Sequence, residues 1–177
     1  MEELTINIVP ADGLSADSLE AIIELCSAAF EEDYRPYLDA FEGATHVLGT
    51  VDGRLVSHGL WIERWLQVAD SELLRTAYVE GVATDELFRR RGYAAAVMRR
   101  IIKDVQNFEL AALSPFSVSY YGRLGWEPWG GPLFARTADG IEPSPEDEEV
   151  MIYRLPKTPD LDLSAPLSVE WRAGDVW

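Results

Sequence analysis

Apolar residues recur at helical spacing in the first part of the chain, and this pattern predicts two helices. One apolar face runs through residues 15–30 and holds Leu19, Ile22, Ile23, Cys26 and Phe30. Ser15 or Asp17 can cap its start. The stretch DYRPYLDAF, residues 33–41, predicts a second, short helix. Pro36 is tolerated in the first turn of that helix, because an N–H there would have no helical partner.

Alternating apolar and polar positions then predict an antiparallel meander. Residues 45–68 read as two strands joined at Asp52-Gly53, a dipeptide typical of two-residue hairpin turns. A turn near residues 69–71 leads to a third strand over residues 73–84. The first half of the chain therefore ends in three consecutive strands.

The second half predicts a long helix over residues 91–107, whose apolar positions are Val97, Met98, Ile101, Ile102 and Val105. A short strand at 108–114 and a short helix at 117–126, closed by Gly125, follow. Residues 126–129 and 150–156 resemble the last hairpin strands, with an acidic loop at 140–150 between them, and residues 167–177 form a strand or an extended tail. The order predicts a mixed α/β fold with one strand–helix–strand crossover, in a single domain spanning 1–177.

Composition and charge limit the classes of partner that the protein can bind. The chain is 47% hydrophobic and has a formal net charge of -16, so it should repel nucleic acid and anionic membranes and attract a cationic small substrate. The alternative is that the acidity only maintains solubility. No apolar run approaches the length of a membrane helix, and MEELTINIVP lacks the apolar core of a secretory signal, so a cytoplasmic location is expected.

A basic cluster stands out against this acidity. Six of the fifteen basic residues lie between Arg89 and Lys103, and three of them directly precede Gly92 at a strand-to-helix turn. The first amides of a helix lack internal partners and attract anions, and Gly92 and Ala94 let a ligand approach the backbone. The pattern predicts a bound polyphosphate, and the alternative is a solvated basic helix face.

Glu80 interrupts an otherwise apolar strand beside Gly81, which permits a bulge. It is the best candidate for a general base, acting through a water, and the alternative is a structural carboxylate paired with a surface cation. His46 and His58 are twelve residues apart, without Cys or acidic partners at ligand spacing, so no metal site is expected.

Several motifs resemble a known family. The segment R-x-x-G-x-A at Arg89–Ala94, after VEGVA at 79–83, is similar to the pyrophosphate loop of the GCN5-related N-acetyltransferases (GNAT), and YYGRLGW at 120–126 is similar to their Y-x-x-x-G-[FW] segment. Together with WRAGDVW at 171–177, these pieces resemble the aminoglycoside 2'-N-acetyltransferases. The resemblance extends from Tyr78 to Trp177 and is looser in the N-terminal third.

The resemblance implies a mixed central sheet splayed between its fourth and fifth strands, flanked by helices, with acetyl-CoA as the cofactor. The implied cofactor residues are Val82, Ala83, Arg89, Arg90, Arg91, Gly92, Tyr93, Ala94 and Ser114. The amide of Val82 would polarise the thioester carbonyl, Glu80 would act as base and Tyr121 as acid, while Tyr120 packs. The alternative for Tyr121 is a core aromatic residue with a bonded hydroxyl. The activity implied is acetylation of an amino group, at the 2' position, of aminoglycoside antibiotics, which confers resistance.

Candidate residues for the acceptor site are Asp33, Glu80, Gly81, Glu148, Glu149, Asp175 and Trp177. Carboxylates in loops suit an acceptor with several ammonium groups, and of these acids Asp33 and Asp175 match family positions. The alternative for the acidic loop that holds Glu148 and Glu149 is plain solubility. Trp177 would stack on a sugar ring while its carboxylate binds an amine, and a homodimer is expected. Pro115 and Phe116 replace a more serine-rich segment of the family. Other readings are a GNAT enzyme for another small amine or a protein N-terminus, or a non-catalytic acyl-CoA-binding module.

Overall fold

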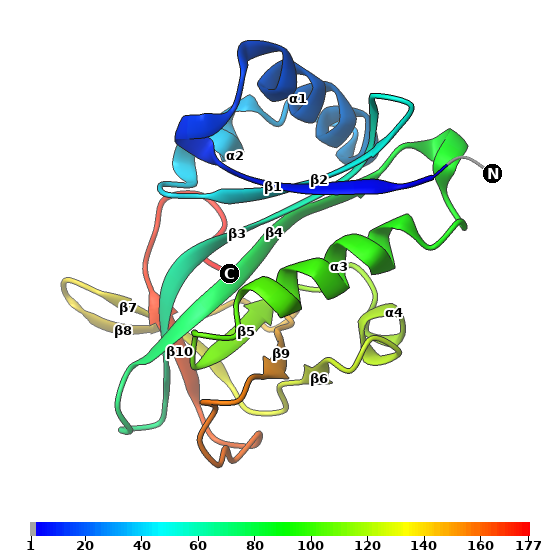
Figure 1. The fold of residues 1–177 in the computed structure, drawn as a ribbon. Helices are drawn as coiled ribbons and strands as arrows, with labels where there is room; N and C mark the ends of the chain where they lie inside the picture. The colour runs from blue at the N-terminus through cyan, green and yellow to red at the C-terminus, as the bar shows by residue number, and fades with distance from the viewer. Residues whose placement is uncertain (1–2) are drawn as a thin grey trace. The chain divides into compact units, whose positions relative to one another are not determined.

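The computed structural model describes residues 3–177 (Figure 1), and they divide into two compact units. Unit 1 contains the described residues up to Ile62 together with Val79–Asp104, and unit 2 contains Glu63–Tyr78 together with Val105–Trp177. Strands β3 (Arg54–Val68) and β4 (Leu74–Thr84) each contribute one end to each unit. Whether this makes one domain, as the length predicts, stays a prediction.

Unit 1 is built on antiparallel strands. β1 (Thr5–Pro10) pairs with β2 (Thr45–Val51), which pairs with β3 across the predicted hairpin. Asp52 and Gly53 have φ values of 49° and 79°, as a type I′ turn requires, so the hairpin prediction is confirmed.

The helices of unit 1 lie on both faces of these strands, as Figure 1 shows for α1 and α3. They are α1 (Ala16–Phe30), α2 (Arg35–Ala40) and α3 (Tyr93–Asp104), with short 3-10 turns η1 (Ala11–Gly13) and η2 (Glu86–Phe88). Ser15 caps α1 by accepting from Ser18 N–H at 3.1 Å, as predicted. Alternate β3 residues face the two helix layers: Gly59 faces α3, and His58 faces Cys26 of α1.

Unit 2 has the strand order β6-β9-β5-β4-β3-β10-β7-β8. Besides the ends of β3 and β4 it holds β5 (Leu110–Leu113), α4 (Val118–Gly122), β6 (Glu127–Pro128), β7 (Leu133–Thr137), β8 (Gly140–Pro143), β9 (Met151–Arg154) and β10 (Leu167–Glu170). β5 is parallel to β4 and reached through α3, which confirms the predicted crossover.

The pairing of β4 with β5 covers Thr76 to Tyr78, although β4 continues to Thr84. The sheet is therefore mixed and splayed between its fourth and fifth strands, as predicted. Among residues 3–177, no helix has both the length and the apolar character needed to cross a membrane.

Three strands were not predicted. β1 alternates exposed and half-buried residues over much of its length, but its partner β2 follows only after α1 and α2, so no hairpin turn marks β1 as a strand. β7 and β8 form a hairpin, and all four residues of β8 are exposed, so no apolar alternation marks it. The predicted acidic loop at 140–150 is thus wrong for its first four residues, which pair through backbone groups.

Candidate active site

The predicted base lies where the regular geometry of β4 is interrupted. Gly81 has a φ of 59°, the left-handed conformation that a bulge at this position needs, and Glu80 beside it is half-buried. A Cβ on Gly81 would lie 2.8 Å from Tyr34 Oη and 3.3 Å from His58 Cε1, so a larger residue does not fit without movement. Position 81 is therefore restricted to glycine by both its backbone conformation and its close packing.

A buried polar cluster lies against this glycine. His58 Nδ1 is 2.7 Å from Gly81 O, His46 Nδ1 is 3.0 Å from His58 Nε2, and Cys26 Sγ is 3.6 Å from His58 Nδ1. His58 is fully buried and His46 is 3% exposed. Burial lowers the pKa of His58 to about 3 and that of His46 to about 4, so both rings are neutral near pH 7.

Sequence reasoning left this cluster without a role. His46 and His58 lie on adjacent strands, and the register places Leu48 opposite His58, so His46 is its diagonal neighbour on the same face. The hairpin register, together with the alternation of side chains along each strand, could have predicted that His46 and His58 share a face. Among the residues that the structure describes, no group of three or more His, Cys, Asp or Glu side chains is arranged to hold a metal ion.

The turn predicted to bind polyphosphate is an open backbone cradle. Arg90 and Gly92 have φ values of 62° and 81°, and no atom lies within 4 Å of a Cβ built on Gly92. The first helical bond runs from Ala96 N–H to Gly92 O at 3.0 Å, so the preceding amides lie before the regular helical ladder. Left-handed residues alternating with others orient successive N–H groups toward an anion. The backbone geometry fits a pyrophosphate.

The arginines of this turn are held at its edge. Arg89 Nε donates to Thr84 O at 3.3 Å, and Arg91 Nη2 donates to Leu87 O at 3.4 Å. The Arg91 guanidinium lies 4.9 Å from the centre of the Phe88 ring. All three arginines, 89 to 91, are exposed, which suits them to add charge beside the cradle rather than to fill it.

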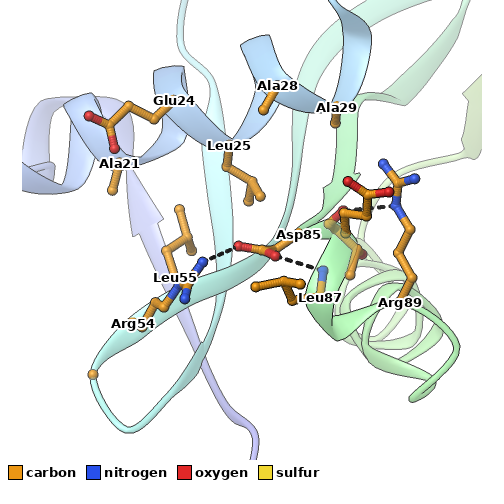
Figure 2. A pocket seen from close by; sticks show the side chains of 13 residues that line it. Ala21, Glu24, Leu25, Ala28, Ala29, Arg54, Leu55, Asp85, Leu87 and Arg89 are labelled. Atoms are coloured by element: carbon orange, nitrogen blue, oxygen red, sulfur yellow. Dashed lines mark hydrogen bonds and ion pairs between the residues drawn. The ribbon is translucent and has the colours of Figure 1, made fainter.

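Arg89 also lines a pocket of about 530 Å³ in unit 1 (Figure 2). The wall is formed by α1, the β2–β3 hairpin and the segment after β4. Arg54 and Asp85 form an ion pair of 2.5 Å in this pocket, and Asp85 also accepts from Leu87 N–H at 2.9 Å (Figure 2). These bonds fix the start of η2 and hence the approach to the turn at 89–94.

In unit 2, the predicted acid is held by the end of α4. Tyr121 O accepts from Leu124 N–H at 2.9 Å and from Trp126 N–H at 3.2 Å, and Gly125 N–H donates to Gly122 O at 3.1 Å. With a φ of 94° at Gly125, this is a Schellman motif, so Gly125 closes the helix as predicted. Tyr121 is 3% exposed, and burial, followed by the nearby Tyr120, raises its pKa. The phenol therefore keeps its proton.

Part of the predicted acidic site also comes together in unit 2. Ser114 Oγ donates to Glu148 Oε1 at 3.1 Å, and burial raises the pKa of Glu148, opposed by the Ser114 bond and reinforced by Asp175. Ser114, predicted for the cofactor, thus contacts a residue predicted for the acceptor. Glu149 and Asp175 are exposed.

Trp177 is buried within unit 2. The residue is 4% exposed, its Nε1 donates to Ser144 Oγ at 2.7 Å, and its O accepts from Arg172 Nη2 at 3.3 Å. Stacking on a sugar would require the segment to move, and that role stays a prediction. Asp33, in unit 1, is exposed and paired with Arg35 at 3.3 Å.

Residues 11–129 match the family model described as an acetyltransferase (GNAT) domain. The chain belongs to the GNAT acetyltransferase family. Acetyl-CoA, the cofactor expected from the sequence, is the acetyl donor of this family. The chain is also 32% identical, over 98% of its length and 92% of the relative's, to an aminoglycoside 2'-N-acetyltransferase of Mycolicibacterium fortuitum.

Solved GNAT structures share the fold. YhbS of Escherichia coli, crystallised with CoA, superposes with a TM-score of 0.69 at 17% identity, over 97% of this chain and 91% of that one. Eis1 of Mycobacterium abscessus superposes with a TM-score of 0.61 at 20% identity, over 73% of this chain and 32% of that one. The chain thus spans about a third of the length of Eis1, and at these identities the likeness concerns the fold alone.

Proposed function

We propose that this GNAT protein acetylates the 2'-amino group of aminoglycosides, using acetyl-CoA. The observation that carries the proposal is the 32% identity to an aminoglycoside 2'-N-acetyltransferase, which extends over 98% of the chain. The net charge of -16 supports it, because aminoglycosides are polycations and a strongly acidic protein attracts them.

The residues that would hold the cofactor are those of the open cradle. The amides around Arg90 to Ala94 would bind the pyrophosphate, with Arg89 and Arg91 supplying charge, and the backbone of Val82 and Ala83 would pair with the extended arm. When bound, acetyl-CoA supplies an acetyl group activated as a thioester. The open space at Gly92 supports this assignment, since a side chain there would occupy the volume above the amides.

Glu80 is the proposed base, because an amino sugar must lose a proton before it attacks. Its half-buried position keeps the carboxylate in reach of solvent, so a water can relay the proton. The amide of Val82, the next peptide after Gly81, is the proposed donor to the carbonyl oxygen as negative charge develops there. A single preorganised donor of this kind contributes about 3 kcal/mol.

Tyr121 is the proposed proton donor to the departing sulfur. Burial raises its pKa, so the hydroxyl carries its proton at neutral pH. Asp33, Glu148, Glu149 and Asp175 are proposed to bind the ammonium groups. The raised pKa of Glu148 supports this, because a carboxylate that is costly to ionise alone gains most from a cation.

A matched substrate pair tests the proposal. Kanamycin B carries an amine at the 2' position, and kanamycin A carries a hydroxyl there. Release of the coenzyme A thiol can be followed with a thiol reagent. We expect this release with kanamycin B, and only the background rate with kanamycin A. Equal turnover of both would refute 2' selectivity. Turnover only of polyamines or peptides would instead favour a GNAT enzyme for another amine.

Two variants test the assigned roles. Glu80→Gln and Tyr121→Phe should each lower kcat by roughly 100-fold, the contribution typical of general acid–base groups. Both variants should bind coenzyme A with unchanged affinity in calorimetric titration. Coenzyme binding by the wild type without any turnover would favour a non-catalytic acyl-CoA-binding module.

Resistance, cytoplasmic location and a homodimer belong to the same proposal. Expression in a susceptible bacterium should raise the inhibitory concentration of kanamycin B and leave that of kanamycin A unchanged. Sedimentation should give twice the mass of 19.8 kDa. Recovery of the protein outside the cytoplasmic fraction after cell fractionation would contradict the expected location.

A further inference from the structure

We propose that the buried His46–His58 pair is a positioning device that orients the Gly81–Val82 peptide for catalysis. The inference rests on the proposed function, because it assumes that Val82 N–H is the donor to the reacting carbonyl. It adds two residues, both on the hairpin β2–β3, that contact neither substrate nor cofactor in that proposal.

Two side chains contact the carbonyl oxygen of Gly81. A carbonyl oxygen only accepts hydrogen bonds, so at 2.7 Å the Nδ1 of His58 must donate to it. Cys26 Sγ lies 3.9 Å from the same oxygen and donates weakly from α1. The carbonyl is therefore held by two side chains on the α1 face of the strands.

These contacts determine which nitrogen carries the proton on each histidine ring. A neutral His58 with its proton on Nδ1 has a bare Nε2, which must accept. The neighbour at 3.0 Å is His46 Nδ1, so His46 donates to it. The chain of bonds thus has one direction, from His46 to His58 to Gly81 O, and His46 selects the tautomer of His58 that Gly81 requires.

The orientation of the Gly81 carbonyl also sets the orientation of the Val82 N–H. The Gly81 carbonyl and the Val82 N–H belong to one planar trans peptide, in which the two groups point in opposite directions. Fixing the carbonyl toward His58 therefore fixes the N–H away from it, toward the side opposite α1. Gly81 has a φ of 59°, so the regular strand geometry is interrupted there. The hydrogen bond from His58 to Gly81 O therefore supplies the orientation of the Gly81–Val82 peptide.

Three variants separate positioning from packing. His58→Leu removes the donor to Gly81 O. His58→Asn places an amide N–H where Nδ1 was and should restore the bond. Leu60→Ala is the matched control: Leu60 is also fully buried on β3 and on the same face, two residues away. It should lower stability without touching Gly81.

The kinetic test uses kanamycin B as the acceptor. His58→Leu should lower kcat by roughly 10- to 100-fold, somewhat less than outright loss of an oxyanion donor, with the KM values changed less than about 3-fold. His58→Asn should recover most of kcat. Leu60→Ala should retain kcat even if its melting temperature falls as far as that of His58→Leu.

Two spectroscopic measurements do not depend on turnover. In the free protein, nitrogen NMR of labelled histidine should show the Nδ1-protonated tautomer at both rings, and His46→Phe should disturb it at His58. With acetyl-CoA labelled at the carbonyl carbon, the infrared carbonyl stretch should move to lower frequency in the wild type and in Leu60→Ala, but not in His58→Leu.

The outcomes are distinguishable. If the wild type neither binds acetyl-CoA nor acetylates any amine, the proposed function fails. If the wild type is active but folded His58→Leu retains full kcat and the shifted carbonyl stretch, the positioning role is refuted while the function stands. An Nε2-protonated His58 in the free protein would refute it as well.

Discussion

Replacing Gly81 by alanine tests the packing on which the β4 site depends. The added Cβ would meet Tyr34 Oη at 2.8 Å and His58 Cε1 at 3.3 Å. Tyr34 cannot easily withdraw, because it is 5% exposed and its ring lies 5.3 Å from Phe30 and 5.3 Å from Tyr37 between centroids.

The expected loss of stability in Gly81→Ala has two parts. A left-handed φ of 59° costs an alanine about 1–2 kcal/mol relative to glycine. Forcing a methyl group into a packed site typically costs a further 1–3 kcal/mol or so. A total of about 3 kcal/mol would lower the melting temperature of a protein of this size by roughly 6–12 °C.

The assay is thermal unfolding by calorimetry, with Gly43→Ala as the control. Gly43 has a φ of 66°, and no atom lies within 4 Å of the position that a Cβ would take there, so that variant reports backbone strain alone. Gly81→Ala should be less stable than Gly43→Ala, and adding Tyr34→Phe should recover part of the difference. Equal losses in the two glycine variants, or no recovery with Tyr34→Phe, would refute the reasoning.

Three further predictions follow from the same contacts. His46 and His58 have folded pKa values of about 4 and about 3, below the ordinary 6.5, so the unfolded state binds more protons and stability falls as pH drops below about 6.5. At about pH 5 each histidine should lower the free energy of unfolding by about 2 kcal/mol, measured by urea titration, and an unchanged pH dependence in the double asparagine variant would contradict this. Gly92→Ala should weaken coenzyme A binding by about 10-fold in calorimetric titration, since a methyl group would fill the open cradle, and unaltered affinity would argue against that cradle. Arg64→Met should lower stability by about 3 kcal/mol and expose residues 171–177 to protease, because the buried guanidinium of Arg64 donates to the backbone oxygens of Glu170 at 2.7 Å and Val176 at 2.5 Å; a tail that stays protected from protease would count against it.

Local patterns predicted those features that local physics controls. The hairpin at Asp52-Gly53, the cap at Ser15 and the closure at Gly125 each depend on the conformations open to one or two residues, and these are encoded in residue type. The open turn at 89–94 belongs to the same group, because the position of Gly92 and the start of α3 determine its backbone conformation, while its binding of an anion stays a prediction. The GNAT motifs are such local features, which is why the family could be recognised from the sequence.

Only the tertiary structure decided which distant residues meet. The sequence shows only two histidines twelve residues apart; the hairpin register places His46 diagonally beside His58, and Gly81 from another strand supplies the acceptor. Trp177 likewise lies buried against Ser144, a contact that no spacing encodes. The physical reason is that an isolated strand specifies which side chains share a face, whereas pairing between strands and helix packing determine their partners.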